Sequence, residues 1–251
     1  MKKTIIMFLT AILLPIAANA QENGEFSKSG YGAHAGIRHS TYTSAFGYYF
    51  TPFTMITAGL DLTWGKASLG LDYSLGKGKI RYDSSILMGI AKKGNADGPS
   101  YKEDVYIRHH KGDPYFPSDM MISLSYAFLD NKHVKFGPMI GFGFDSISDG
   151  VKNDDRSWIM KGSQLAAGLT VGWKFHRMVT TPENESNRKY IENLLKAKFF
   201  FASNTYPNWS MKISDGKRQE KVITGEIPNQ RSITFNIAIT ADILFNPLKQ
   251  K

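Results

Sequence analysis

Hydrophobic side chains occupy every second position along much of this chain. In residues 56–64 the even positions are isoleucine, alanine, leucine, leucine and tryptophan, whereas the odd positions are threonine, glycine, aspartate and threonine. Residues 67–75 repeat the pattern, with alanine, leucine and tyrosine on one face and serine, glycine and aspartate on the other. A period of two predicts β-strands with one apolar and one polar face. The alternation dominates the chain, and a helix is expected only for residues 183–195. The chain is therefore predicted to belong to the all-β class.

Ten segments show this alternation, and several of them have nine residues or more. They are residues 31–37, 44–50, 56–64, 67–75, 80–90, 122–128, 134–144, 165–175, 195–201 and 233–245. Strands of globular proteins usually have about 5–6 residues, whereas a strand that crosses a bilayer needs roughly 9–11. The lengths therefore favour an antiparallel up-and-down transmembrane β-barrel. Because bacterial single-chain barrels have even strand numbers, we expect about ten strands, with eight as the alternative.

The spacing of the segments predicts which connections share an end of the barrel. With ten strands, the long loops fall on the outer side, and the short turns fall on the periplasmic side. The expected outer loops are residues 92–118, 146–162 and 206–230. The expected periplasmic turns are residues 51–53, 76–79 and 129–132, together with one long turn at 178–194.

The two faces of the segments differ in a way that favours a lipid-facing exterior. The polar faces consist mainly of glycine, serine, threonine and asparagine, which suit the crowded interior of a narrow barrel. The apolar faces carry aromatic residues near the strand ends, as in the interfacial girdles of membrane barrels. The predicted girdle residues are Tyr31, Trp64, Tyr73, Trp173, Phe175 and Phe245.

The first twenty residues have the form of a secretory signal peptide. Lys2 and Lys3 precede an almost wholly apolar stretch, and Ala18-Asn19-Ala20 supplies the small residues of a cleavage site. No twin arginine is present, so the general secretory route is expected. Residues 21–251 are predicted to form a single domain. The chain has no cysteine, which excludes a disulfide scaffold and a cysteine nucleophile.

With this pattern the mature chain resembles the small outer-membrane β-barrel proteins of Gram-negative bacteria. Such proteins usually end in an aromatic residue, a place that Phe245 would fill, although residues 246–251 follow it. The resemblance implies a location in the outer membrane and a structural, adhesive or small-solute passage role. It also implies outer-membrane lipid, lipopolysaccharide and the barrel-assembly machinery as partners. The oligomeric state is left open.

The inward faces of the predicted strands carry charged residues. A turn at residues 65–66 would place Asp61 opposite Gly70 and Gly59 opposite Asp72. The next hairpin would place Asp72 opposite Asp83 and Ser74 opposite Arg81. Opposed carboxylates repel each other and need a cation nearby. We therefore predict a lumen ion-pair network that fills the barrel, with a proton or ion path, or paired carboxylates for acid/base chemistry, as the alternatives. Its residues are Asp61, Asp72, Asp83, Arg81, Lys135 and Lys174, and Lys196 and Lys198 are also expected to point inward.

Two histidine pairs are weak candidates for chemistry. His109 and His110 are adjacent, so on a strand they point to opposite sides and make a poor metal site. His39 and Ser40 face apart for the same reason and make a poor base and nucleophile. No phosphate loop, nucleotide fingerprint or zinc protease motif occurs. We therefore predict no catalytic residue, no metal, no cofactor and no enzymatic activity.

The formal charge of +9 does not indicate nucleic-acid binding, because lysine and arginine are mixed with acidic residues in the loops. Two other functional classes remain as alternatives. One is a soluble periplasmic or secreted β-sheet binding protein. The other is an outer-membrane barrel enzyme that acts on lipid or peptide.

Overall fold

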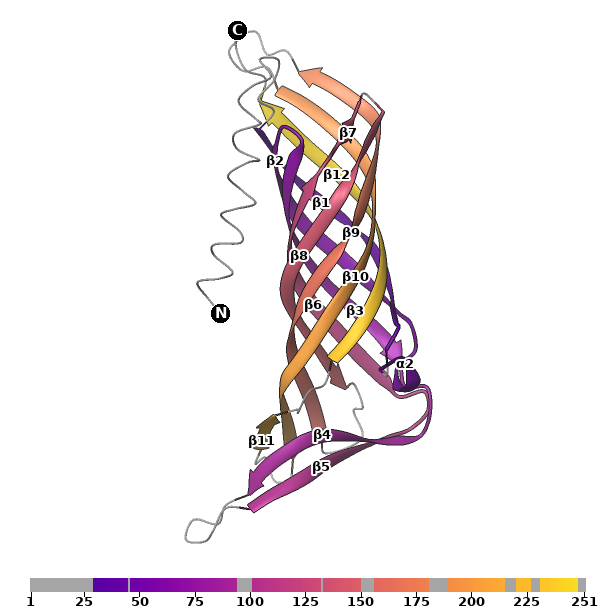
Figure 1. Ribbon diagram of the computed structural model, residues 1–251, viewed down its shortest axis with the longest axis vertical. Coiled ribbons are helices and arrows are strands. Elements are labelled where there is room, and N and C mark those ends of the chain that lie inside the picture. The colour runs from indigo at the N-terminus through magenta and orange to yellow at the C-terminus, as the bar shows by residue number, and fades with distance from the viewer. Residues whose placement is uncertain are drawn as a thin grey trace.

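The computed structural model describes residues 29–44, 46–93, 101–131, 133–149, 156–180, 189–214, 220–226 and 231–247. Within them, eight long strands form a closed antiparallel barrel (Figure 1). These strands are β1 (Ser29–Tyr42), β2 (Phe53–Trp64), β3 (Ala67–Lys79), β6 (Pro114–Tyr126), β8 (Val134–Asp149), β9 (Arg156–Thr180), β10 (Lys189–Ser214) and β12 (Arg231–Pro247). The order is β12-β1-β2-β3-β6-β8-β9-β10, and β10 pairs with β12 to close the sheet.

The sequence predicted one helix, at residues 183–195, and a signal peptide at residues 1–20. In the part of the chain that the structure describes, no helix has both the length and the hydrophobicity of a membrane span. The predicted signal peptide, residues 1–20, lies outside the described residues. The helix expected at 183–195 is wrong for residues 189–195, which belong to β10. Residues 183–188 lie outside the described residues.

The barrel has eight strands, the stated alternative, because two of the ten predicted segments leave it. Residues 44–50 contain α2 (Phe46–Tyr49), a single helical turn in which the Phe50 N–H donates to the Phe46 carbonyl oxygen at 2.9 Å. Phe46 and Phe50 are four residues apart, so one side of a helical turn can bury both rings. The same residues also fit a period of two, which is why the sequence predicted a strand.

Residues 80–90 also lie outside the barrel wall. β4 (Ser84–Lys93) pairs with β5 (Tyr101–His109) in a hairpin, and β11 (Glu220–Glu226) pairs with both β10 and β4. A short β7 (Leu129–Asp130) pairs with β8. The segments predicted as outer loops therefore contain strand β5, strand β11 and the extended ends of β8, β9 and β10.

The two ends of the barrel differ in what they carry. One end, which we call the loop end, carries α2, the β4–β5 hairpin and β11, at the bottom of Figure 1. The opposite turn end carries the tight β2–β3 turn, where Gly65 has a φ of 56°, short strand β7, and the paired ends of β9 and β10 at Thr180 and Lys189. Residues 51–53 and 76–79 were expected at the end opposite the long loops, but they lie at the loop end. The reason is that residues 44–50 do not form a strand, so the chain crosses the barrel one time fewer before residue 51 than predicted.

Strand pairing confirms one predicted hairpin and corrects the next. Asp61 pairs with Gly70, and Gly59 pairs with Asp72, as predicted. Asp72 pairs with Met121 and not with Asp83, however, because the neighbour of β3 in the barrel is β6. The predicted pairing of Ser74 with Arg81 is wrong for the same reason.

The apolar face of the barrel wall points outward. Leu71 is 41% exposed, whereas the next residue, Asp72, is 3% exposed and lies in the lumen. The same division holds along the other strands: large apolar side chains are exposed and polar side chains are buried.

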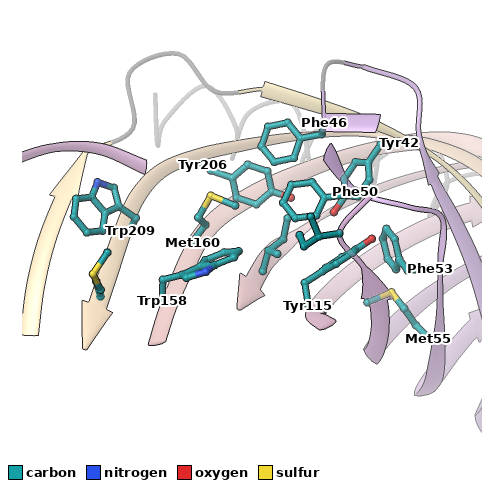
Figure 2. Packing of buried hydrophobic residues seen from close by; sticks show 13 residues of the cluster. Tyr42, Phe46, Phe50, Phe53, Met55, Tyr115, Trp158, Met160, Tyr206 and Trp209 are labelled. Carbon is teal, nitrogen blue, oxygen red and sulfur yellow. The ribbon is translucent and has the colours of Figure 1, made fainter. Parts of the chain in front are cut away.

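Towards the loop end the pattern is reversed: the inward face becomes apolar and the outward face becomes more polar. On β9, Trp158 and Met160 point inward and are buried, while Ser157 and Lys161 are exposed. On β10, Tyr206 and its apolar neighbours are buried in the same core (Figure 2). The outer surface of the barrel is therefore apolar along its middle and polar at the loop end, so these two parts suit different environments.

Candidate functional site

A histidine at the centre of the lumen joins two buried aspartates. His34 Nδ1 lies 2.7 Å from Asp61 Oδ2, and His34 Nε2 lies 2.8 Å from Asp72 Oδ1. These three residues come from β1, β2 and β3, which are consecutive in the barrel. An ionised carboxylate only accepts hydrogen bonds. When both carboxylates are ionised, both ring nitrogens of His34 must carry a proton, so the side chain is a cation.

Two lysines of β10 complete this cluster from the other side of the lumen. Lys198 Nζ lies 2.7 and 2.9 Å from the two carboxylate oxygens of Asp72. Lys196 Nζ lies 3.3 Å from Asp61 and also contacts Asp242 of β12. The resulting chain of alternating charges, which we call the lumen charge cluster, runs in the order Lys198, Asp72, His34, Asp61, Lys196, Asp242. With His34 protonated its three cations balance its three carboxylates, which buried charges require.

A second polar layer lies between the charge cluster and the loop end. The Arg38 guanidinium pairs with Asp119 of β6, and its Nη2 lies 2.8 Å from Met55 Sδ. The Tyr206 hydroxyl donates to Asp145. Arg38, Met55, Asp119 and Asp145 line a cavity of about 10 Å³, which is close to the space needed by one water molecule.

A cluster of buried aromatic residues, which we call the aromatic plug, fills the lumen on the loop-end side of this layer (Figure 2). Phe46 stacks on Tyr206 with ring centroids 5.5 Å apart, and Phe50 meets Tyr115 edge to face at 4.7 Å. The Tyr115 hydroxyl donates to the Thr51 carbonyl oxygen at 2.7 Å, which ties β6 to the segment after α2. Three successive layers of side chains therefore fill the barrel from its middle to its loop end.

The six predicted network residues do not lie together. Asp61 and Asp72 belong to the charge cluster. Asp83 is at the loop end, where it accepts a hydrogen bond from the Lys111 backbone N–H at 2.7 Å. The Arg81 backbone N–H donates to the Tyr49 carbonyl oxygen, also at the loop end.

Lys135 and Lys174 lie at the turn end. Their Nζ atoms are 3.8 and 2.5 Å from Asp130.

Sequence reasoning missed His34 and Asp242 as partners in the cluster. The pairing of β1 with β2 and of β10 with β12 brings them to Asp61 and Lys196, and the pattern within one strand does not predict which strands pair. A histidine on an inward face, with Gly32 and Gly36 at the two neighbouring positions of that face, was the available signal in the sequence.

Four predicted girdle residues are exposed on the outer wall: Tyr31, Trp64, Tyr73 and Trp173. Phe245 stacks on Tyr31 at 5.7 Å near the turn end. The side chain of Phe175 lies outside the described residues. Their contact with a membrane interface stays a prediction.

The two histidine pairs face apart, as predicted. His39 is exposed, with Nδ1 3.2 Å from the Thr54 hydroxyl, whereas Ser40 is buried and donates to Asn236. His109 is buried with its ring edge to face against Trp158, whereas His110 is exposed. Neither pair brings two reactive groups to one place.

Three ligand atoms in the lumen are close enough to hold a metal ion. They belong to His34, Asp61 and Asp242, and all lie within 4.8 Å of one another. Lys196 Nζ already contacts both carboxylates, so a metal ion would have to displace that ammonium group. The donor set therefore fits a lysine better than a divalent ion.

The fold and the lumen together define a closed eight-stranded antiparallel β-barrel filled by side chains. No protein-family model matches the chain, and no curated protein matches it. Among solved structures, it is similar to a major outer membrane protein from Thermus thermophilus, at 12% identity and a TM-score of 0.40, over 84% of this chain and 98% of that one.

Two further solved structures are similar at the same level. The attachment invasion locus protein Ail of Yersinia pestis matches at 10% identity and a TM-score of 0.37, over 86% of this chain and 99% of that one. The outer membrane protease OmpT from Escherichia coli matches at 11% identity and a TM-score of 0.34, over 90% and 99%.

Proposed function

We propose that this protein is an integral outer-membrane β-barrel with a sealed lumen, and that it serves a structural or adhesive role at the cell surface. The observation that carries the proposal is the band of exposed apolar side chains around the middle of the barrel. Exported, membrane-inserted barrels of this kind would meet outer-membrane lipid, lipopolysaccharide and the barrel-assembly machinery.

The apolar band is too extensive for a protein surrounded by water. Exposed apolar patches on soluble monomers rarely exceed a few hundred Å². Here large apolar side chains are exposed on all eight barrel strands. Examples, one for each strand, are Ile37, Leu60, Leu71, Ile122, Phe142, Leu165, Phe201 and Ile239. This surface disfavours a soluble periplasmic or secreted protein.

The height of the band matches a bilayer. On β2 the outward apolar residues extend from Ile56 to Trp64, and on β9 they extend from Leu165 to Trp173, which is nine residues in each case. Tilted strands of roughly 9–11 residues cross the hydrocarbon layer. On the loop-end side of Leu165 the outward side chains of β9 include Ser157, Lys161 and Ser163. This part of the strand therefore extends out of the bilayer into water.

The lumen disfavours passage of solutes. The charge cluster, the Arg38 layer and the aromatic plug lie one above another. Moving an ion through them would separate buried ion pairs, which costs several kcal/mol for each pair broken. A structural or adhesive role, exercised by the loop end, therefore fits better than conduction.

An enzymatic role is also disfavoured. The buried Ser40 hydroxyl donates to Asn236 and is directed away from His39, so this pair lacks the contact between nucleophile and base that covalent catalysis needs.

Membrane fractionation tests the proposal. The folded protein should stay with the membrane after a carbonate wash and should migrate differently on a gel when it is not boiled. In planar bilayers it should show no conductance. Release by carbonate would contradict the membrane location, whereas steady conductance would contradict the sealed lumen alone.

A further inference from the structure

The outer wall of the barrel changes from apolar to polar at a definite residue on each strand at the loop end. The first outward polar side chain beyond the apolar band is a hydroxyl on five strands. These are Thr54, Ser118, Ser146, Ser163 and Ser203. On the remaining three strands it is His39, Lys77 or Arg231. We call these eight residues the collar.

Acidic residues are absent from the collar, and the reason is their orientation. Among barrel-strand residues whose side chains the structure describes, the carboxylates all lie on the inward face. They are Asp61, Asp72, Asp119, Asp145, Asp149 and Asp242. The outward cations of the same strands are Lys77, Lys79, Lys161 and Arg231, and all four lie on the loop-end side of the apolar band. The edge of the band at this end is therefore positively charged.

The collar is best ordered on β1, β2 and β3. His39 pairs with Thr54, and Thr54 pairs with Lys77, so the three side chains form one row on the outer wall. The His39 ring nitrogen lies 3.2 Å from the Thr54 hydroxyl. Lys77 Nζ lies 5.9 Å from the centroid of the exposed Phe116 ring, a cation–π arrangement that holds the ammonium beside the row.

We infer that the collar binds phosphate groups of the anionic glycolipid in the outer leaflet. This inference rests on the proposed membrane location. Lysine, arginine, histidine and hydroxyl side chains can all donate hydrogen bonds to phosphate oxygens. Their position at the edge of the apolar band is where headgroup phosphates lie while the acyl chains cover the band. The row of His39, Thr54 and Lys77 supplies donors from three strands to one phosphate.

The test is a lipid titration of the full-length folded protein in detergent micelles. The probes are lipid A with both phosphates, the same lipid after removal of its phosphates, and inorganic phosphate. The measurement is the temperature at which the folded form is lost on a gel. Only the phosphorylated lipid should raise this temperature.

The variant to compare carries both Lys77→Ala and Arg231→Ala. Each cation near an anionic lipid surface changes affinity about fivefold, so this variant should need roughly twenty-five times more phosphorylated lipid for half of the shift. Lys66→Ala is the matched control, because Lys66 is exposed but lies in the turn at the opposite end. It should respond like the unaltered protein.

Two results would overturn the inference. One is an equal response of the double variant and the control to phosphorylated lipid. The other is an equal shift with inorganic phosphate, which would identify a site for free anions. Failure of the proposed function is recognised separately, since carbonate would then release the unaltered protein from membranes.

Discussion

His34 Nε2 lies 2.8 Å from Asp72 Oδ1, and this contact joins two strands that are separated in the barrel by β2. The imidazole bridges across its neighbour strand because position 59, between them, is a glycine. A Cβ at Gly59 would lie 2.6 Å from His34 Nε2, so a larger residue there would displace the ring. Three adjacent strands are therefore joined by one side chain at the centre of the lumen.

Replacement of this histidine should destabilise the barrel strongly. His34→Ala leaves Asp61 and Asp72 with less compensation, and breaking a buried ion pair costs about 3–5 kcal/mol. Urea unfolding in lipid vesicles measures the loss. His39→Ala is the control, because His39 is on the same strand but is exposed, and exposed substitutions usually change stability by less than about 0.5 kcal/mol. Equal stability of the two variants would contradict the role of the cluster.

A second prediction concerns the lipid-facing wall. Leu71→Arg should cost about 2–4 kcal/mol if the side chain lies near the bilayer midplane. Ser203→Arg, in the collar, should cost only about 0–1 kcal/mol because it reaches the interface. Equilibrium unfolding in vesicles compares the two. If Leu71→Arg were as well tolerated as Ser203→Arg, Leu71 would not face lipid.

A third prediction concerns the aromatic plug. Phe50 is 2% exposed and contacts Tyr115 and Phe46, so Phe50→Ala should cost about 3–5 kcal/mol. Tyr48→Ala, in the adjacent helix α2 but 65% exposed, should have a small effect. The Phe50 variant should still show no conductance in planar bilayers, since the charge cluster closes the lumen below the plug. Conductance in this variant would show that the plug alone seals the barrel.

The sequence was sufficient for the architecture because the period of two is set by the strand itself. It identified all eight barrel strands, the outward face of Leu71 and the inward face of Asp72. It failed at 44–50 because phenylalanines at positions 46 and 50 fit both a strand and a helical turn, and only the packing inside the barrel mouth selects the turn.

The lumen was harder to predict because it depends on which strands are neighbours. Once residues 80–90 leave the wall, β6 becomes the neighbour of β3, and Asp83 no longer faces Asp72. The aspartates on β2 and β3 were recovered from one hairpin, whereas His34 and Lys198 required pairing across β1 and β10. A single local error therefore moved Asp83 and Arg81 out of the predicted network.

The last prediction concerns the contact between the β4–β5 hairpin and the barrel. Burial against Trp158 lowers the pKa of His109 from its usual 6.5, and nearby Asp113 only partly offsets this. A histidine with a lowered pKa binds fewer protons in the packed state than in the opened state. The packed state is therefore fully stable above about pH 6.5, and it loses stability as the pH falls below that value.

Hydrogen exchange of residues 101–109 measures this opening. Intrinsic amide exchange is base-catalysed and slows as the pH falls from 7 to 5. The observed exchange should slow by less than the intrinsic rate does, and this excess exchange reports the opening. His109→Phe keeps a ring against Trp158 but removes the titrating group, so it should abolish the excess. His110→Phe, at the exposed neighbour, should keep it. An excess that survives in the His109 variant would mean that another group at this contact takes up the proton.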